Sequence, residues 1–82
     1  MEVAKEFKDY NRIKVMLAEK RRTNKWLAEV LDKDPATVSK WCTNNSQPSI
    51  ELLYRIAEAL DVDVKDLLRS NKSGEWDVSA TD

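Results

Sequence analysis

Residues 23–43 read TNKWLAEVLDKDPATVSKWCT and predict two short helices separated by a tight turn. The first helix begins after Thr23, whose hydroxyl can accept a hydrogen bond from a free backbone N–H group at the helix start. Four apolar residues then follow at helical spacing, before Asp32 ends the pattern: Trp26, Leu27, Val30 and Leu31. Asp34 is a good N-cap for the second helix, and Pro35 suits its first position, where no backbone N–H is needed.

The second predicted helix has two faces of different character. One face is apolar and carries Val38 and Trp41, three residues apart, with Cys42 beside them. The other face is small, polar and weakly charged, and it carries Pro35, Ala36, Thr37, Ser39, Lys40 and Thr43. Such a surface suits the DNA major groove, which admits a helix and displays donors, acceptors and thymine methyl groups. The same pattern also describes an amphipathic helix that merely covers a core, so periodicity alone leaves both interpretations open.

Charge is distributed unevenly along the 82 residues. The net charge of −1 by itself argues against a nucleic-acid-binding protein. Residues 10–47, however, carry eight basic and four acidic side chains, whereas residues 48–82 carry four basic and eight acidic ones. The basic half therefore contains the helix pair, and a field polarised in this way would turn that half toward phosphate groups.

Composition limits the classes of protein that the chain can represent. The length of 82 residues and the hydrophobic fraction of 41% are sufficient for one domain with a small core. One cysteine permits no internal disulfide, and the absence of histidine leaves little support for an enzyme or a metal site. We therefore expect no catalytic residues, no metal and no cofactor. Without a long apolar run or a signal-peptide pattern, we expect a cytoplasmic protein that does not contact membranes.

Helical spacing also dominates the rest of the chain. A helix from Asn11 to about Arg21 is predicted to bury Tyr10, Ile13, Met16 and Leu17. A helix capped by Ser49 is predicted to bury Ile50, Leu53, Ile56, Ala57 and Leu60. A short helix after Asp63, with Asp66 completing a capping box, would close the core through Val62, Val64, Leu67 and Leu68. Leu52 and Tyr54 lie off these stripes and are candidates for a subunit contact.

The ordered set of these motifs resembles the Cro/phage-repressor (lambda-repressor-like, XRE-type) helix-turn-helix family. The resemblance is carried by Thr23-Asn24, Leu27-Ala28-Glu29, Leu31, Thr37-Val38-Ser39-Lys40-Trp41, Pro48-Ser49, Ile56-Ala57-Glu58-Ala59-Leu60 and Val64-Lys65-Asp66-Leu67-Leu68. It implies an all-α fold, a compact five-helix bundle that contains a helix-turn-helix. It also implies that residues 11–69 form the DNA-binding domain, with residues 1–10 as an N-terminal extension and residues 70–82 as a polar, disordered tail.

The resemblance also implies which residues meet DNA. The recognition helix, residues 35–43, would lie in the major groove with base-facing Pro35, Ala36, Thr37, Ser39, Lys40 and Thr43. Phosphate contacts would come from Arg22, Asn24, Lys25, Lys33 and Asn45. Asn24 stands where the family usually has glutamine, and Asp32 replaces a usual turn glycine. Leu17 and Cys42 replace an Arg–Glu pair of many relatives, so we expect an apolar contact in place of an ion pair.

The predicted function is sequence-specific binding of double-stranded DNA by a transcriptional regulator, a repressor that acts as a homodimer. The alternative is an antitoxin or another protein-interaction module that uses the C-terminal tail to hold a protein partner. Trp76 and Val78 are the observation behind this alternative, since they are large apolar residues in an otherwise polar segment.

Overall fold

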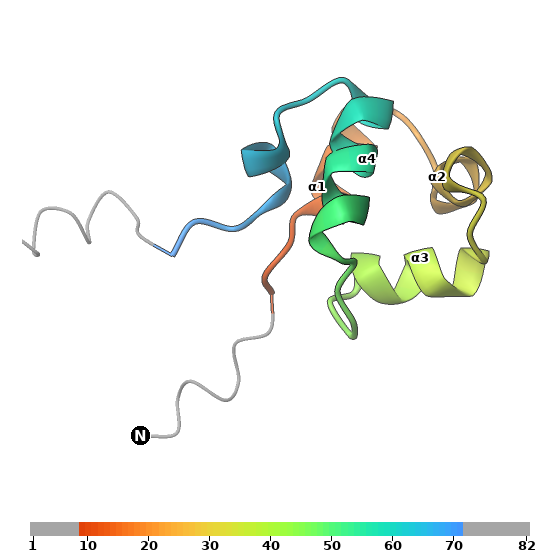
Figure 1. Cartoon of the computed structure of the whole chain (residues 1–82), viewed down its shortest axis with the longest axis horizontal. Coiled ribbons are helices and arrows are strands. Elements are labelled where there is room, and N and C mark those ends of the chain that lie inside the picture. Colours follow the sequence, from red (N-terminus) through yellow and green to blue (C-terminus); the bar gives the residue numbers. More distant parts are fainter. Residues whose placement is uncertain (1–8, 72–82) are drawn as a thin grey trace, which may run out of the picture.

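The computed structural model describes residues 9–71, which form four α-helices and one short 3₁₀ helix (Figure 1). The elements are α1 (Ile13–Glu19), α2 (Asn24–Leu31), α3 (Pro35–Cys42), α4 (Ile50–Leu60) and the 3₁₀ helix η2 (Val64–Leu67). The predicted all-α class is confirmed for this part of the chain. The expectations for Trp76 and Val78 concern residues outside the described range.

The prediction of five α-helices is wrong, because the fifth element is a single 3₁₀ turn. Asp63 caps it as expected, since its Oδ1 atom accepts a hydrogen bond from the backbone nitrogen of Lys65 at 3.1 Å. After four residues, however, Leu68 adopts extended backbone angles and pairs with Asn11 as an isolated antiparallel bridge. The chain therefore leaves the helical conformation before an α-helical turn can propagate.

Each of the other predicted N-caps is present. The side-chain oxygens of Thr23, Asp34 and Ser49 accept backbone N–H groups at the starts of α2, α3 and α4. The distances to the backbone nitrogens are 3.0 Å from Thr23 to Trp26, 2.9 Å from Asp34 to Ala36 and 3.1 Å from Ser49 to Leu52. These short-range bonds satisfy donors that the helices themselves leave free, so they fix where each helix begins.

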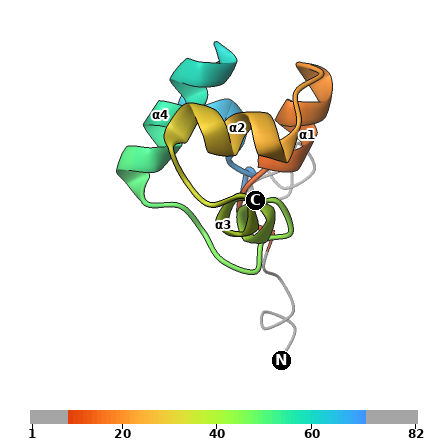
Figure 2. The same cartoon turned by 90° about the vertical axis from the view of Figure 1, so that its right-hand side faces the viewer.

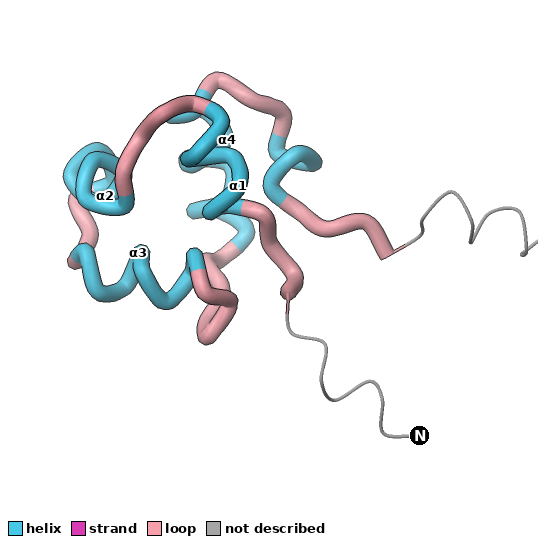
Figure 3. Tube along the Cα trace, turned by 180° about the vertical axis from the view of Figure 1, so that it is seen from behind, coloured by secondary structure: helices cyan, strands magenta, loops and turns pink. Residues whose placement is uncertain are grey.

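Left-handed residues separate the helices in place of glycine. Asp32 and Asp61 end α2 and α4 with φ of 59°, and Asn44 lies just beyond α3 with φ of 63°. Aspartate and asparagine tolerate this conformation better than most residues. Arg21, with φ of 57°, is the costlier case, since arginine lacks the short polar side chain that can hydrogen-bond locally in this conformation. Figure 3 shows the resulting short connections between α1, α2 and α3.

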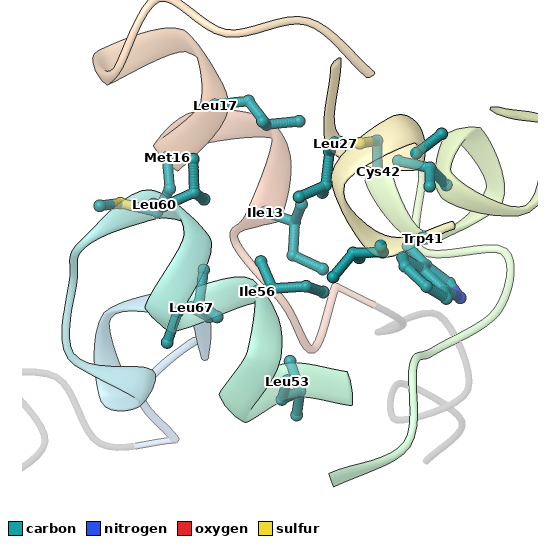
Figure 4. Close-up of a cluster of buried hydrophobic side chains, with 14 residues drawn as sticks. Ile13, Met16, Leu17, Leu27, Trp41, Cys42, Leu53, Ile56, Leu60 and Leu67 are labelled. Atoms are coloured by element: carbon teal, nitrogen blue, oxygen red, sulfur yellow. The ribbon is translucent and has the colours of Figure 1, made fainter. Parts of the chain in front are cut away.

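The core lies between the four α-helices and η2 (Figure 4). Its buried apolar side chains are Ile13, Met16, Leu17, Leu27, Ala28, Leu31, Val38, Trp41, Cys42, Leu53, Ile56, Ala57, Leu60 and Leu67. Every element contributes, and α2 and α3 pack closely against each other. The helix pair is therefore part of the folded unit, and α3 is attached to it by its apolar face.

Four residues that were predicted to be buried are exposed. They are Tyr10, Val30, Ile50 and Leu68, with exposed fractions of 57%, 46%, 68% and 41%. Ile50 is the first residue of α4 and extends past the edge of the core, whereas Tyr10 precedes α1, which begins only at Ile13. The apolar period in the sequence thus continues beyond the point where a packing partner is present. No helix within residues 9–71 is long and apolar enough to cross a membrane.

Candidate nucleic-acid interface

One face of α3 is anchored in the core while the opposite face is exposed. Val38, Trp41 and Cys42 are buried, with exposed fractions of 0%, 4% and 8%. The residues predicted to face bases are exposed at five positions and half-buried at Thr37; the five are Pro35, Ala36, Ser39, Lys40 and Thr43. Figure 1 shows α3 along the lower edge of the molecule, and Figure 2 shows α2 lying across it. The structure therefore presents a continuous strip of small and polar side chains on an outer edge.

The hydroxyl of Thr43 is partly committed within its own helix. Its Oγ1 atom lies 3.2 Å from the carbonyl oxygens of both Ser39 and Lys40 and can donate to either. A hydroxyl has one proton, so the Thr43 oxygen keeps acceptor capacity toward an outside donor. Lys40, one turn from Ala36, carries the only ammonium group of α3. The strip thus offers one strong donor, several hydroxyl groups and a methyl group.

Asn24, at the start of α2, contacts the far end of α3. The Cys42 thiol lies 3.3 Å from the Oδ1 atom of Asn24 and can donate a hydrogen bond to it. This contact uses the carbonyl side of the carboxamide, which leaves its NH₂ group available to an acceptor outside the domain. Leu17 and Cys42 both belong to the buried core, and the Cys42 thiol adds a polar link to α2.

The other predicted phosphate-binding residues fall into three places around α3. Arg22 and Lys25 lie with Asn24 at the start of α2, and the Arg22 guanidinium carbon sits 4.6 Å from the centre of the Trp26 ring. Cation–π attraction at this distance restrains the guanidinium group beside the helix start. Lys33 is exposed in the turn before α3, and Asn45 is exposed in the loop after it. Positive or polar groups therefore flank both ends of the strip.

The sequence did not reveal how Lys14 is placed. Lys14 lines a groove of about 390 Å³ together with Cys42 and Thr43, so α1 contributes a cation near the end of α3. In the sequence it is an ordinary exposed lysine on a helix, and only the packing of α1 against α3 brings it to this place. Asn11, Asn44 and Gln47 were also missed and are described below. Within residues 9–71 no group of three potential metal ligands comes together.

Burial raises the pKa of the Cys42 thiol above its ordinary value of 9.0, and the nearby positive charge of Lys14 opposes this with a smaller effect. Desolvation disfavours the thiolate because a charge in an apolar surrounding loses hydration. The thiol is therefore protonated at neutral pH, which is the form that can donate to Asn24.

This shifted pKa predicts a loss of stability at alkaline pH that depends on Cys42. Below pH 9 the thiol is protonated in both states, whereas above pH 9 the unfolded chain releases the proton and the folded chain retains it. The free energy of unfolding then falls as the pH rises, by at most about 1.4 kcal/mol per pH unit. The measurement is the free energy of unfolding across this range for the wild type and for Cys42→Ser, which keeps a donor but does not titrate. A difference between the two proteins that is constant with pH would contradict the prediction.

Comparison with known proteins places this geometry in a family. A family model described as a Cro/C1-type HTH DNA-binding domain matches residues 12–73. The crystal structure of a candidate DNA-binding protein from Bacteroides fragilis is 55% identical, with a TM-score of 0.73, and the match covers 73% of this chain and 97% of that one. No curated protein matches the sequence. The matched range includes the exposed helix α3 and the residues that anchor it in the core. The chain belongs to the Cro/C1-type helix-turn-helix family of DNA-binding domains.

Proposed function

We propose that the protein recognises a specific sequence of double-stranded DNA by placing α3 in the major groove, and that it represses transcription from that site. The observation that carries this proposal is the two-faced burial of α3, with Val38 and Trp41 anchored inside and Ala36, Ser39 and Lys40 exposed. A helix held in this way can insert its outer face into the groove without breaking core contacts. Occupation of a site that overlaps a promoter would exclude polymerase.

The exposed strip supports distinct roles for its side chains. The Lys40 ammonium group is suited to guanine O6 and N7, and the Ala36 methyl group to a thymine methyl. Ser39 and Thr37 supply hydroxyl groups for a base edge or a phosphate, and Thr43 supplies an acceptor. Pro35 gives the start of the helix a rigid apolar surface that approaches DNA without a backbone donor. Lys40 and Ala36 are therefore the residues that we assign to sequence discrimination.

Phosphate contacts would set the orientation of α3 in the groove. We assign them to Arg22, Asn24 and Lys25 at the start of α2, and to Lys33 and Asn45 beside the two ends of α3. Contacts to phosphate fix register and add affinity without carrying sequence information. The NH₂ group of Asn24 is suited to this role because the Cys42 thiol occupies its carbonyl side.

A homodimer on a two-fold symmetric site is part of the proposal, with residues 11–69 as the DNA-binding domain. A groove of about 570 Å³ lies between α4 and the segment that includes η2, and Tyr54, 60% exposed, is part of its lining. The other lining residues are the apolar Ala57, Val62 and Val64 and the charged Glu51, Arg55, Glu58 and Asp63. The apolar part of this surface, on the acidic half of the chain, suits a contact between two copies, away from DNA.

Selection of binding sites from random duplex DNA tests the proposal. The wild type is expected to enrich a defined sequence, and Lys40→Ala is expected to lose preference at one position of each half-site, at a cost of about 1–3 kcal/mol there. A uniform loss of affinity across all sequences would reduce Lys40 to a phosphate contact. The absence of any enriched sequence for the wild type would overturn sequence-specific recognition itself.

A further inference from the structure

Two buried polar side chains meet at the end of α3. Asn11 and Asn44 are the buried polar residues among those described, with exposed fractions of 6% and 9%. They are 33 positions apart in the sequence, and neither belongs to a helix. No buried side-chain nitrogen or oxygen atom in the described chain lacks a hydrogen-bond partner. Buried carboxamides with all their bonds formed are directional restraints, unlike apolar contacts, which permit small sliding movements.

The Asn11 side chain joins the start of α1 to the end of α3. Its Nδ2 atom donates to the carbonyl oxygen of Trp41 at 2.9 Å and to Oε1 of Gln47 at 2.7 Å. Its Oδ1 atom accepts a hydrogen bond at 3.0 Å from the backbone nitrogen of Ile13, the first residue of α1. The bond to Trp41 reaches one of the last carbonyl groups of α3, which also accepts a hydrogen bond from the Asn44 backbone nitrogen at 3.0 Å.

The Asn44 side chain completes the connection from the other direction. Its Oδ1 atom accepts from the backbone nitrogen of Asn11 at 3.0 Å and from Nε2 of Gln47 at 2.9 Å. Its Nδ2 atom donates to the carbonyl oxygen of Asn11 at 3.2 Å. The two side chains and Gln47 therefore form a closed network, which we call the Asn11–Asn44 network.

Residues 10–12 are also hydrogen-bonded through their backbone to residues 67–69, near the end of the described range. The backbone nitrogen of Arg12 donates to the Leu67 carbonyl oxygen at 2.7 Å, and the backbone nitrogen of Arg69 donates to the Tyr10 carbonyl oxygen at 2.9 Å. Residues 10–12 consequently lie between residues 67–69 on one side and the end of α3 on the other. In Figure 1 this segment is the orange-red coil that runs up into α1.

We propose that the Asn11–Asn44 network is a positioning device for the recognition helix: it fixes the angle of α3 relative to the rest of the domain and thereby decides which base edges Lys40 and Thr43 reach. The inference rests on the proposed function. An eight-residue helix is ~12 Å long, so a tilt of ~10° about one end displaces the other by ~2 Å. A hydrogen bond to a base edge needs its donor at one fixed acceptor atom and weakens steeply with displacement, whereas the attraction of a cation to phosphate persists along the DNA backbone.

The test compares specific with non-specific DNA affinity for Asn44→Gly. Glycine accepts the left-handed backbone angle at this position, so the change removes the side-chain bonds and leaves the turn intact. We expect the ratio of the Kd for random duplex to the Kd for the selected site to fall at least tenfold, with the preference at the Lys40-read positions weakened most. Affinity for random duplex and its dependence on salt should stay unchanged.

Two further variants keep the test decisive. Asn45→Gly is the matched change at the neighbouring exposed residue, and as a phosphate contact it should weaken binding to all sequences alike, with the ratio preserved. If Asn44→Gly does not fold, Gln47→Ala removes the outer member of the network and should lower the ratio in the same direction by about threefold.

The outcomes separate the two proposals. If Asn44→Gly, or Gln47→Ala in its place, has a lower Tm but an unchanged ratio, the network is purely structural and the positioning role is overturned, while sequence recognition stands. If the wild type itself shows no difference between selected and random duplex, the proposed function and the positioning role both fall.

Discussion

Replacing Ile56 with alanine is expected to lower the free energy of unfolding by about 2–5 kcal/mol, because Ile56 is fully buried in α4 and its loss leaves a cavity. Figure 4 shows Ile56 at the centre of the core, between Ile13, Trp41 and Leu53. Small domains have total stabilities of about 5–15 kcal/mol, so this one change removes a large fraction of the margin. Urea unfolding monitored by tryptophan fluorescence measures the effect, since Trp41 is itself buried.

Ile50→Ala is the matched control in the same helix. Ile50 is 68% exposed, so the same chemical change there should alter stability by no more than about 0.5 kcal/mol. Alanine also has the higher helix propensity, which opposes any loss. An Ile50→Ala variant as unstable as Ile56→Ala would mean that Ile50 is covered in solution, and the described burial would then be contradicted.

That pair of isoleucines also shows what periodicity can and cannot predict. Both lie on the apolar stripe of one helix, and sequence spacing gives them the same expected burial. The stripe identifies the direction in which side chains point, and this direction was sufficient to predict the burial of Leu53, Ile56 and Leu60. It does not show where the neighbouring elements end, and Ile50 lies beyond that limit. Tyr10 was misplaced for another reason, because α1 begins only at Ile13 and Tyr10 is not part of the helix.

Signals within a few residues were the most informative part of the sequence. The caps at Thr23, Asp34 and Ser49 and the left-handed end at Asp32 depend on backbone groups no more than four positions away. Their chemistry therefore identifies helix starts and ends without knowledge of the tertiary structure. The exposed face of α3 followed from these boundaries, because once the helix start is fixed the side-chain directions are fixed as well.

Long-range polar contacts were not predictable in this way. Asn11 was predicted only as the first residue of a helix, and Asn44 belonged to a loop in which several polar residues looked equivalent. Their pairing spans 33 positions, and nothing in either segment alone indicates it. The contact between Cys42 and Asn24 is a similar case, because each residue was interpreted separately as a departure from the family pattern.

Lys40→Glu is expected to weaken binding to the selected DNA site by about 100-fold or more. The change removes the strongest donor of the exposed strip, which is worth about 1–3 kcal/mol against a correct base. It also places a carboxylate against acceptor atoms and near phosphate groups, and such like-charge contacts add several kcal/mol. In a dimer both subunits carry the change, so the cost in free energy is incurred twice. The Kd for the selected duplex at fixed salt measures it.

Lys65→Glu is the matched charge reversal, since both variants change the net charge from −1 to −3. Lys65 lies in η2, which Figure 1 shows at the opposite side of the bundle from α3. A mere loss of long-range attraction would affect the two variants equally, and raising the salt concentration would remove it in both. We expect instead that Lys65→Glu weakens binding only a fewfold and that the Lys40→Glu defect persists at high salt. Sedimentation must show the same oligomeric state for both proteins. Equal losses that vanish together with salt would mean that α3 senses the charge of DNA and not its base edges, and the assignment of α3 as the recognition helix would have to be withdrawn.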